Sequence, residues 1–134
     1  MNGAVFVSQS FRIRWFRACL VALPGLALMA AQGQAVESID YSRDIRPILS
    51  ENCFQCHGQD PAKREAKLRL DTFEGQRKGD TIVPGKPDDS ELIYRIFSDE
   101  EDVQMPPLKS HRSLTAGQRT LLRRWIEEGA PFSP

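Results

Sequence analysis

Near the middle of the chain lies the stretch Asn52-Cys53-Phe54-Gln55-Cys56-His57-Gly58, and the organisation of the domain can be worked out from it. Cys53 and Cys56 are three positions apart and His57 follows directly, so a single helical turn would carry both thiols and the imidazole on one side. Three side chains with sulfur and nitrogen donors, so close together, form a candidate site for a metal or a metal-containing group.

Cys-x-x-Cys-His is the attachment sequence of c-type haem. The two thiols can reach the two vinyl groups at one edge of a porphyrin, and the imidazole of the next residue can then bind the iron as its proximal ligand. We therefore predict one covalently bound haem c, and hence iron, held by Cys53, Cys56 and His57.

Three other uses of the cysteines fit the sequence less well. A redox-active pair of the thioredoxin type would need a long helix after it, but residues 58–61 read Gly-Gln-Asp-Pro, which ends a helix. A structural zinc site would need four ligands, and His111 is the only histidine besides His57. A disulfide between Cys53 and Cys56 would leave His57 without a role.

Met105 is the candidate for the second axial ligand of the iron. The other methionines, Met1 and Met29, belong to the N-terminal segment that we expect to be removed. Met105 precedes Pro106-Pro107, and two prolines stiffen a loop and so lower the entropy cost of holding a weak sulfur ligand. The alternatives are that Met105 fills a gap in the core, or that His111 is the axial ligand; the polar sequence around His111 favours a solvated side chain.

Residues 1–35 have the pattern of a secretory signal peptide. Arg12, Arg14 and Arg17 precede an apolar run of about fourteen residues, and small residues follow at 33 and 35, the two positions that a signal peptidase reads. The run is shorter than the roughly 20 residues that span a bilayer, so a membrane contact is expected only if the segment is retained as an anchor. We predict a haem domain over residues 36–134, located in the periplasm or otherwise outside the cytoplasm, where c-type haem is attached.

The composition is that of an ordinary globular protein, with 40% hydrophobic and 27% charged positions, and the 134-residue chain is long enough for one domain. Eighteen basic and eighteen acidic residues give a net charge of zero, which argues against a nucleic-acid partner. The expected partner is a redox protein. Residues 99–102 are four consecutive acids; such a run is usually a solvated surface, and the alternative is that it steers a basic partner.

Three amphipathic helices are predicted. The first covers residues 44–52, with Asp44 as N-cap, Pro47 in the first turn, and apolar residues at 45, 48 and 49. The second covers residues 91–97, with Asp88 as N-cap. The third starts with a capping box at Thr115, continues to residue 128 and ends at Gly129.

Other features concern the core and the connections. The first and third helices are expected to cross and bury their apolar faces together. Trp125 is expected to pack in the core, with a hydrogen bond to a haem propionate as the alternative. Leu68 and Leu70 suggest a short extended segment, and Val83-Pro84-Gly85 predicts a type II turn.

These segments together resemble the planctomycete-type cytochrome c domain. The resemblance runs over residues 38–131 and is carried by 44–49, the motif 52–58, 83–87 with Ser90, Met105-Pro106-Pro107, 114–115 and 125–130. It implies an all-α, class I cytochrome c-like domain wrapped around one haem, with long irregular loops. It also implies thioether bonds from Cys53 and Cys56, with His57 proximal and Met105 distal.

The expected function is one-electron transfer through a six-coordinate haem. The alternative is a haem-based sensor or a peroxidase-like enzyme in which Met105 leaves the iron, although the sequence offers no evident catalytic acid–base set besides His111. In the resembled family the haem domain commonly opens a larger exported protein, so a stand-alone carrier and a part of a multidomain system both stay open.

Overall fold

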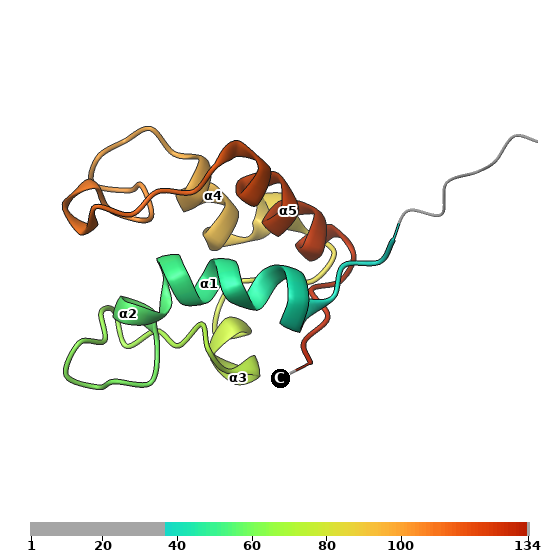
Figure 1. Cartoon of the computed structure of the whole chain (residues 1–134), viewed down its shortest axis with the longest axis horizontal. Helices are drawn as coiled ribbons and strands as arrows, with labels where there is room; N and C mark the ends of the chain where they lie inside the picture. The colour runs from blue at the N-terminus through green and yellow to red at the C-terminus, as the bar shows by residue number, and fades with distance from the viewer. Residues whose placement is uncertain (1–36, 134) are drawn as a thin grey trace, which may run out of the picture. The chain divides into compact units, whose positions relative to one another are not determined.

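The computed structural model describes residues 37–133, and Figure 1 shows their arrangement. The helical elements are the π-helix Tyr41–Ile45 (η1), α1 (Arg46–Asn52), α2 (Phe54–His57), α3 (Phe73–Gln76), the 3-10 helix Pro87–Asp89 (η2), α4 (Glu91–Phe97), the 3-10 helix Leu108–Ser110 (η3) and α5 (Ala116–Glu127). Long irregular segments join them, and residues 37–133 contain no β-strand. The all-α prediction is therefore confirmed.

The predicted signal peptide, residues 1–35, lies outside the described residues. Within the described part, no helix has the length and apolar character needed to cross a membrane. The described residues fall within one compact unit, Val36–Pro134.

The first helical segment begins earlier than predicted. Asp40, not Asp44, is its N-cap: the Asp40 carboxylate accepts a hydrogen bond from the backbone N–H of Arg43 at 2.7 Å. The Asp44 carboxylate accepts in return from the backbone N–H of Asp40 at 2.9 Å. The N-cap prediction was wrong because η1 adds a turn before α1, so Asp44 lies inside the helical run. Pro47 does lie in the first turn of α1, as predicted.

Helix α5 begins after the predicted capping box and ends at Glu127, one residue before the predicted end. Thr115 and Gln118 form the capping box, and Gly129 has a φ of +94°, the left-handed conformation that follows a helix end. Trp125 is fully buried, and its indole N–H donates to the Pro131 carbonyl at 2.9 Å. The core-packing role predicted for Trp125 is thus confirmed, and its N–H is used within the core rather than at a haem propionate.

The apolar faces of α1, α4 and α5 meet in one core, as Figure 1 shows for the helices. The rings of Tyr41 from η1 and Trp125 from α5 pack at a centroid distance of 5.8 Å. The core is made of buried hydrophobic residues from all parts of the described chain, namely Ile39, Tyr41, Ile45, Ile48, Leu49, Leu70, Ile82, Leu92, Ile93, Ile96, Leu114, Leu122, Trp125, Ile126 and Ala130.

Helix α4 has the predicted range but a different N-cap. Ser90 occupies the cap position, but its side chain bonds to the preceding turn and not to the helix. Oγ accepts from the Val83 N–H at 2.9 Å and donates to the Lys86 carbonyl at 2.8 Å. Asp88 lies in η2 and forms an ion pair with Arg123 at 2.8 Å. The Asp88 prediction was wrong because η2 inserts a separate turn before α4.

The connection at residues 83–86 is a turn of the predicted type II. The Lys86 N–H donates to the Val83 carbonyl at 3.0 Å, and Gly85 has a φ of +74°. The Gly85 N–H also donates to the Ile126 carbonyl at 2.8 Å, which ties the turn to α5. The extended segment expected at residues 68–70 forms no strand.

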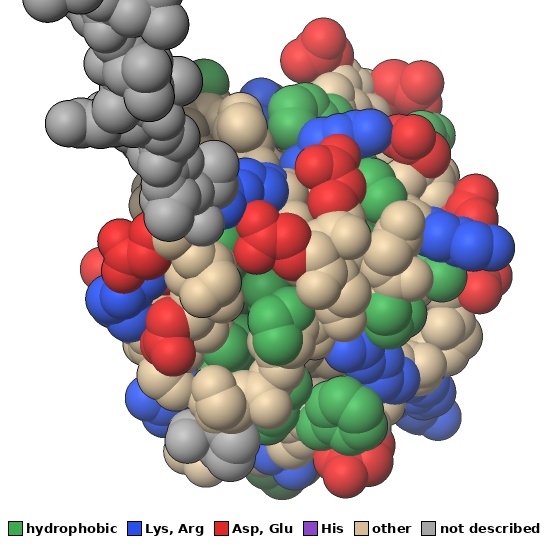
Figure 2. Space-filling view, turned by 90° about the vertical axis from the view of Figure 1, so that its right-hand side faces the viewer, with side chains coloured by type: hydrophobic (Ala, Val, Ile, Leu, Met, Phe, Trp, Pro, Cys, Tyr) green, Lys and Arg blue, Asp and Glu red, His purple; other side chains and the backbone are tan. Residues whose placement is uncertain are grey.

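On the face shown in Figure 2, acidic and basic side chains lie interspersed, with hydrophobic side chains scattered between them. Such mixing agrees with the exposed ion pairs of the domain, for example Arg43 with Glu37 at 2.7 Å and Arg124 with Glu128 at 2.8 Å. Exposed pairs of this kind add little to stability, so the fold depends mainly on the shared core.

Candidate haem site

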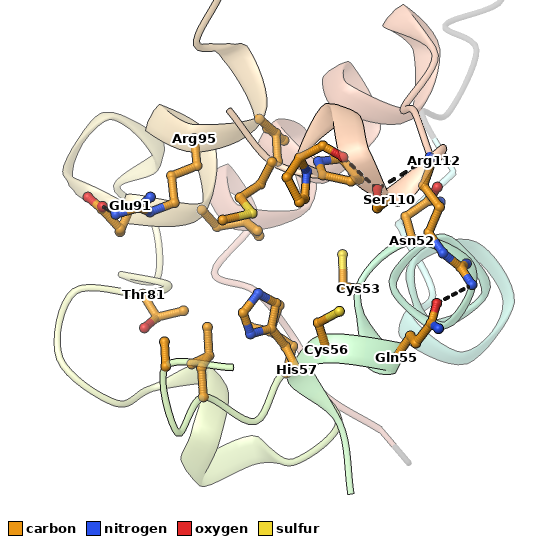
Figure 3. A pocket seen from close by; sticks show the side chains of 18 of the residues that line it. Asn52, Cys53, Gln55, Cys56, His57, Thr81, Glu91, Arg95, Ser110 and Arg112 are labelled. Atoms are coloured by element: carbon orange, nitrogen blue, oxygen red, sulfur yellow. Dashed lines mark hydrogen bonds and ion pairs between the residues drawn. The ribbon is translucent and has the colours of Figure 1, made fainter. Parts of the chain in front are cut away.

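Helices α1 and α2 bring the three side chains of the motif together. Cys53 joins the two helices, and its N–H donates to the Leu49 carbonyl at 2.8 Å. The N–H groups of Cys56 and His57 both donate to the Cys53 carbonyl, at 3.1 and 2.8 Å. This backbone turn places both sulfurs and the imidazole at the same cavity, as Figure 3 shows.

The cavity has a volume of about 510 Å³, within the range of about 300–1,000 Å³ that is usual for small molecules and cofactors. All four side chains predicted as ligands or attachment points line it: Cys53, Cys56, His57 and Met105. His111 does not line it; its side chain is exposed, as predicted for a solvated residue. Apolar side chains make up much of the remaining wall, including Leu68, Leu70, Leu92, Ile96 and Pro106.

Backbone contacts fix the loop that carries Met105. Its N–H donates to the carbonyl of Arg95 in α4 at 3.0 Å. The next residue, Pro106, is buried, and the Met105–Pro106 peptide bond is cis. Ser110 then closes the loop, because its backbone N–H and its hydroxyl both donate to the Pro107 carbonyl, at 2.9 and 2.7 Å. Met105 is therefore held against α4 at the cavity wall.

The segment after the motif folds back and fastens onto it. The Glu65 N–H donates to the Cys56 carbonyl, and the Leu70 N–H donates to the His57 carbonyl, each at 2.8 Å. Arg64 adds a side-chain bond, with Nε donating to the Gly58 carbonyl at 2.8 Å. The backbone of Cys56 and His57 is thus bonded both to the preceding helix and to the following loop.

Two residues that support this arrangement were missed in the sequence. Gln76 is fully buried, and its Nε2 donates to the Leu70 carbonyl at 2.8 Å and to the Tyr41 hydroxyl at 3.1 Å. Nothing in its polar sequence surroundings marks it as a core residue. Gly58 was read only as a turn signal; a Cβ at this position would collide with the Phe54 carbonyl, so the close return of the chain itself requires a glycine.

Burial shifts the pKa values of His57 and Cys53. Burial lowers the pKa of His57, and the positive charge of Arg95 lowers it further. The nearby Glu65 carbonyl opposes this shift, although it completes no hydrogen bond to the buried Nδ1. The neutral imidazole, which is the form that binds metals, is therefore favoured. Burial also raises the pKa of the Cys53 thiol to about 12, against a smaller opposing effect of Arg112. Cys53 thus stays a protonated thiol.

Charged side chains at the cavity were not anticipated. Lys78, Arg95 and Arg112 line it together with Glu91. Arg95 pairs with Glu91 at 2.7 Å, and Arg112 donates to the Gln55 side chain at 2.8 Å. In Figure 3, Arg95 and Glu91 lie across the cavity from Cys53, whereas Arg112 lies on the same side as Cys53.

The residues present fit a haem. Cys53 and Cys56 are free thiols, as thioether formation requires. The buried Nδ1 of His57 has no hydrogen-bond partner in the described part of the chain, so the imidazole is not committed to another protein group through this atom. An apolar wall with sulfur and imidazole donors suits a porphyrin with its iron, and the cations at the cavity can balance the two carboxylates that a haem carries.

Comparison with known proteins agrees with this assignment. A family model described as planctomycete cytochrome C matches residues 53–109, a range that begins at the first cysteine of the motif and includes Met105. The remaining segments of the resemblance, 38–52 and 110–131, lie outside the matched range. Neither the search of curated proteins nor that of solved structures found a significant match. Over residues 53–109 the chain is thus similar to the planctomycete cytochrome C family, and this similarity supports a c-type cytochrome domain.

Proposed function

We propose that this domain is a one-electron carrier with a single haem c attached through Cys53 and Cys56. His57 is the proximal iron ligand in this proposal, and Met105 is the distal one. The observation that carries the proposal is the cavity itself, because a loop distant in sequence brings Met105 to the same cavity as the three motif side chains.

Attachment is a thiol addition to each vinyl group. Each thiol would add across one vinyl double bond of the haem, with its hydrogen passing to the neighbouring carbon, so that attachment would consume no oxidant or reductant. The free thiols of Cys53 and Cys56 support this step. When bound, the haem supplies an iron that alternates between the ferric and ferrous states and so carries one electron.

The protein's own residues fix the ligands and exclude competitors. Burial keeps the imidazole of His57 neutral, and the segment that returns to the Cys56 and His57 carbonyls holds its backbone. The loop bonded to the Arg95 carbonyl holds Met105. If Met105 held the iron together with His57, its thioether would close the iron to small ligands and would raise the reduction potential relative to a second imidazole.

The place of action in this proposal is outside the cytoplasm, in the periplasm or an equivalent compartment. It is supported by the signal pattern of residues 1–35 and by the attachment of c-type haem on that side of the membrane. The partner is a redox protein, which the domain meets by diffusion unless residues 1–35 are retained as an anchor.

The test is to express the full chain with a haem-attachment system and to record its spectra. We expect colour that survives acid–acetone extraction, sharp bands on reduction, and no change with carbon monoxide. Met105→Ala should make the reduced protein bind carbon monoxide and should lower the midpoint potential. A colourless product would refute haem attachment, and an unchanged spectrum in Met105→Ala would refute the distal ligand. Ready binding of carbon monoxide to the unmutated protein would favour the sensor or peroxidase-like alternative.

A further inference from the structure

We propose that the outer face of α4 is the docking surface for a basic redox protein; this rests on the proposed electron transfer. The surface is an open hollow of about 550 Å³ that we call the α4 groove. It is lined by Tyr94 and Phe97 of α4, by Asp88, Asp99 and Glu100, and by Arg123 of α5.

The α4 groove contains two large side chains that the fold leaves unburied. Tyr94 is 54% exposed and Phe97 is 46% exposed, although their helix neighbours Ile93 and Ile96 are core residues. Aromatic residues are enriched at protein–protein interfaces relative to the rest of the surface. Two of them on one exposed helix face provide an apolar contact for a partner.

The charge around the aromatic pair selects the partner. Three carboxylates line the groove against one guanidinium, that of Arg123, which is already paired with Asp88 at 2.8 Å and with Glu127 at 3.2 Å. The acids at 99–102 form no ion pair within residues 37–133. Complementarity therefore calls for a partner with lysine or arginine residues around an apolar centre.

The same helix connects the α4 groove to the haem cavity. Arg95 and Ile96 line the cavity, whereas Tyr94 and Phe97 line the groove. The carbonyl of Arg95 also accepts the hydrogen bond that holds Met105. A helix with its side chains is about 10 Å wide, so a partner in the groove would be separated from the cavity by a single helix.

The test uses the haem-loaded full chain and a photoactive ruthenium tris-bipyridyl complex attached to a tetralysine peptide that ends in tryptophan. We expect photoreduction rates that saturate with peptide concentration and fall with ionic strength, and no saturation with the tetraglutamate version. The double variant Asp99→Asn/Glu100→Gln should weaken binding about threefold to tenfold. Phe97→Ser should also weaken binding but should keep the dependence on salt.

The matched control removes two exposed acids elsewhere, Glu51→Gln/Glu74→Gln, and should change binding by less than about twofold. An equal loss in this control would overturn the proposal, because it would show attraction to net charge alone. Calorimetric binding of the same peptide, which needs no electron transfer, separates the two claims. Binding at the α4 groove without photoreduction would refute electron transfer. Equal binding by the Asp99→Asn/Glu100→Gln variant and the Glu51→Gln/Glu74→Gln control would refute the docking surface.

Discussion

Replacing Ser90 by alanine should destabilise the domain more than replacing Asp88 by alanine, although the sequence pattern predicts Asp88 as the N-cap of α4. Ser90 is 1% exposed, and its hydroxyl accepts the Val83 N–H at 2.9 Å and donates to the Lys86 carbonyl at 2.8 Å. Alanine would leave the half-buried Val83 N–H without a partner, which costs about 1–3 kcal/mol. The Lys86 carbonyl would keep a partner, because it also accepts from the Asp89 N–H at 3.2 Å. The expected loss for Ser90→Ala is therefore about 1–3 kcal/mol in the free energy of unfolding.

Asp88→Ala removes only the ion pair with Arg123, and the Asp88 side chain is 82% exposed. Solvent screens such a pair, so the loss should be clearly smaller than that for Ser90→Ala. The assay is urea unfolding of the haem-loaded variants, followed by circular dichroism, with midpoints compared at equal slope. Ser50→Ala is the control, because Ser50 is an exposed serine within α1 and makes no side-chain hydrogen bond among the described residues.

The reasoning would be refuted if Asp88→Ala cost as much as Ser90→Ala, since Asp88 would then support α4 as the sequence suggests. It would also fail if Ser90→Ala unfolded at the same urea concentration as the unmutated protein. In that case the Ser90 hydroxyl would be replaceable by water or by a small backbone shift, and the turn at 83–86 would not depend on it.

Three further outcomes follow from the structure. Thr115→Ala should lower the free energy of unfolding by about 1 kcal/mol in the same urea assay, because it removes the capping box of α5. His111→Ala should leave the reduced spectrum and the midpoint potential unchanged, since the exposed His111 does not line the cavity; a shift in either would reopen bis-histidine ligation. The ion pair with Arg69 at 2.6 Å lowers the pKa of Asp71 below its ordinary 3.8, so the stabilisation is present above about pH 4 and is lost as the pH falls through the lowered pKa. Asp71→Asn should remove that part of the acid dependence, as acid titrations followed by circular dichroism would show.

The features that sequence could predict are those written in short, local patterns. Residues 91–97 and the capping box at Thr115 follow from apolar spacing and from a three-residue capping pattern, and the structure confirms both. The clustering of Cys53, Cys56 and His57 follows from one helical turn. Met105 was predicted as a ligand by elimination among the methionines, from the proline pair after it and from the resemblance, and it does line the cavity.

The features that sequence could not predict depend on distant contacts or on competing local ones. The N-caps at Asp40 and Ser90 replaced the predicted Asp44 and Asp88 because short π and 3-10 turns precede the α-helices. Such turns shift a helix start by a few residues without changing the apolar pattern. Gln76 can be buried because its Nε2 donates to the Leu70 carbonyl and the Tyr41 hydroxyl. Only the folded chain brings these groups together.

The return of the 58–70 segment to the motif is made mainly by main-chain atoms, through the N–H groups of Glu65 and Leu70. Because main-chain atoms make these hydrogen bonds, they do not depend on the identity of the side chains in between. The side chains of Gln59, Lys63 and Lys67 in this segment are exposed to solvent. Lys63 is thus a suitable residue to exchange for a fluorophore-bearing cysteine. A dye placed there would lie close in sequence to His57, the proposed iron ligand, and its quenching would report cofactor loading during biogenesis.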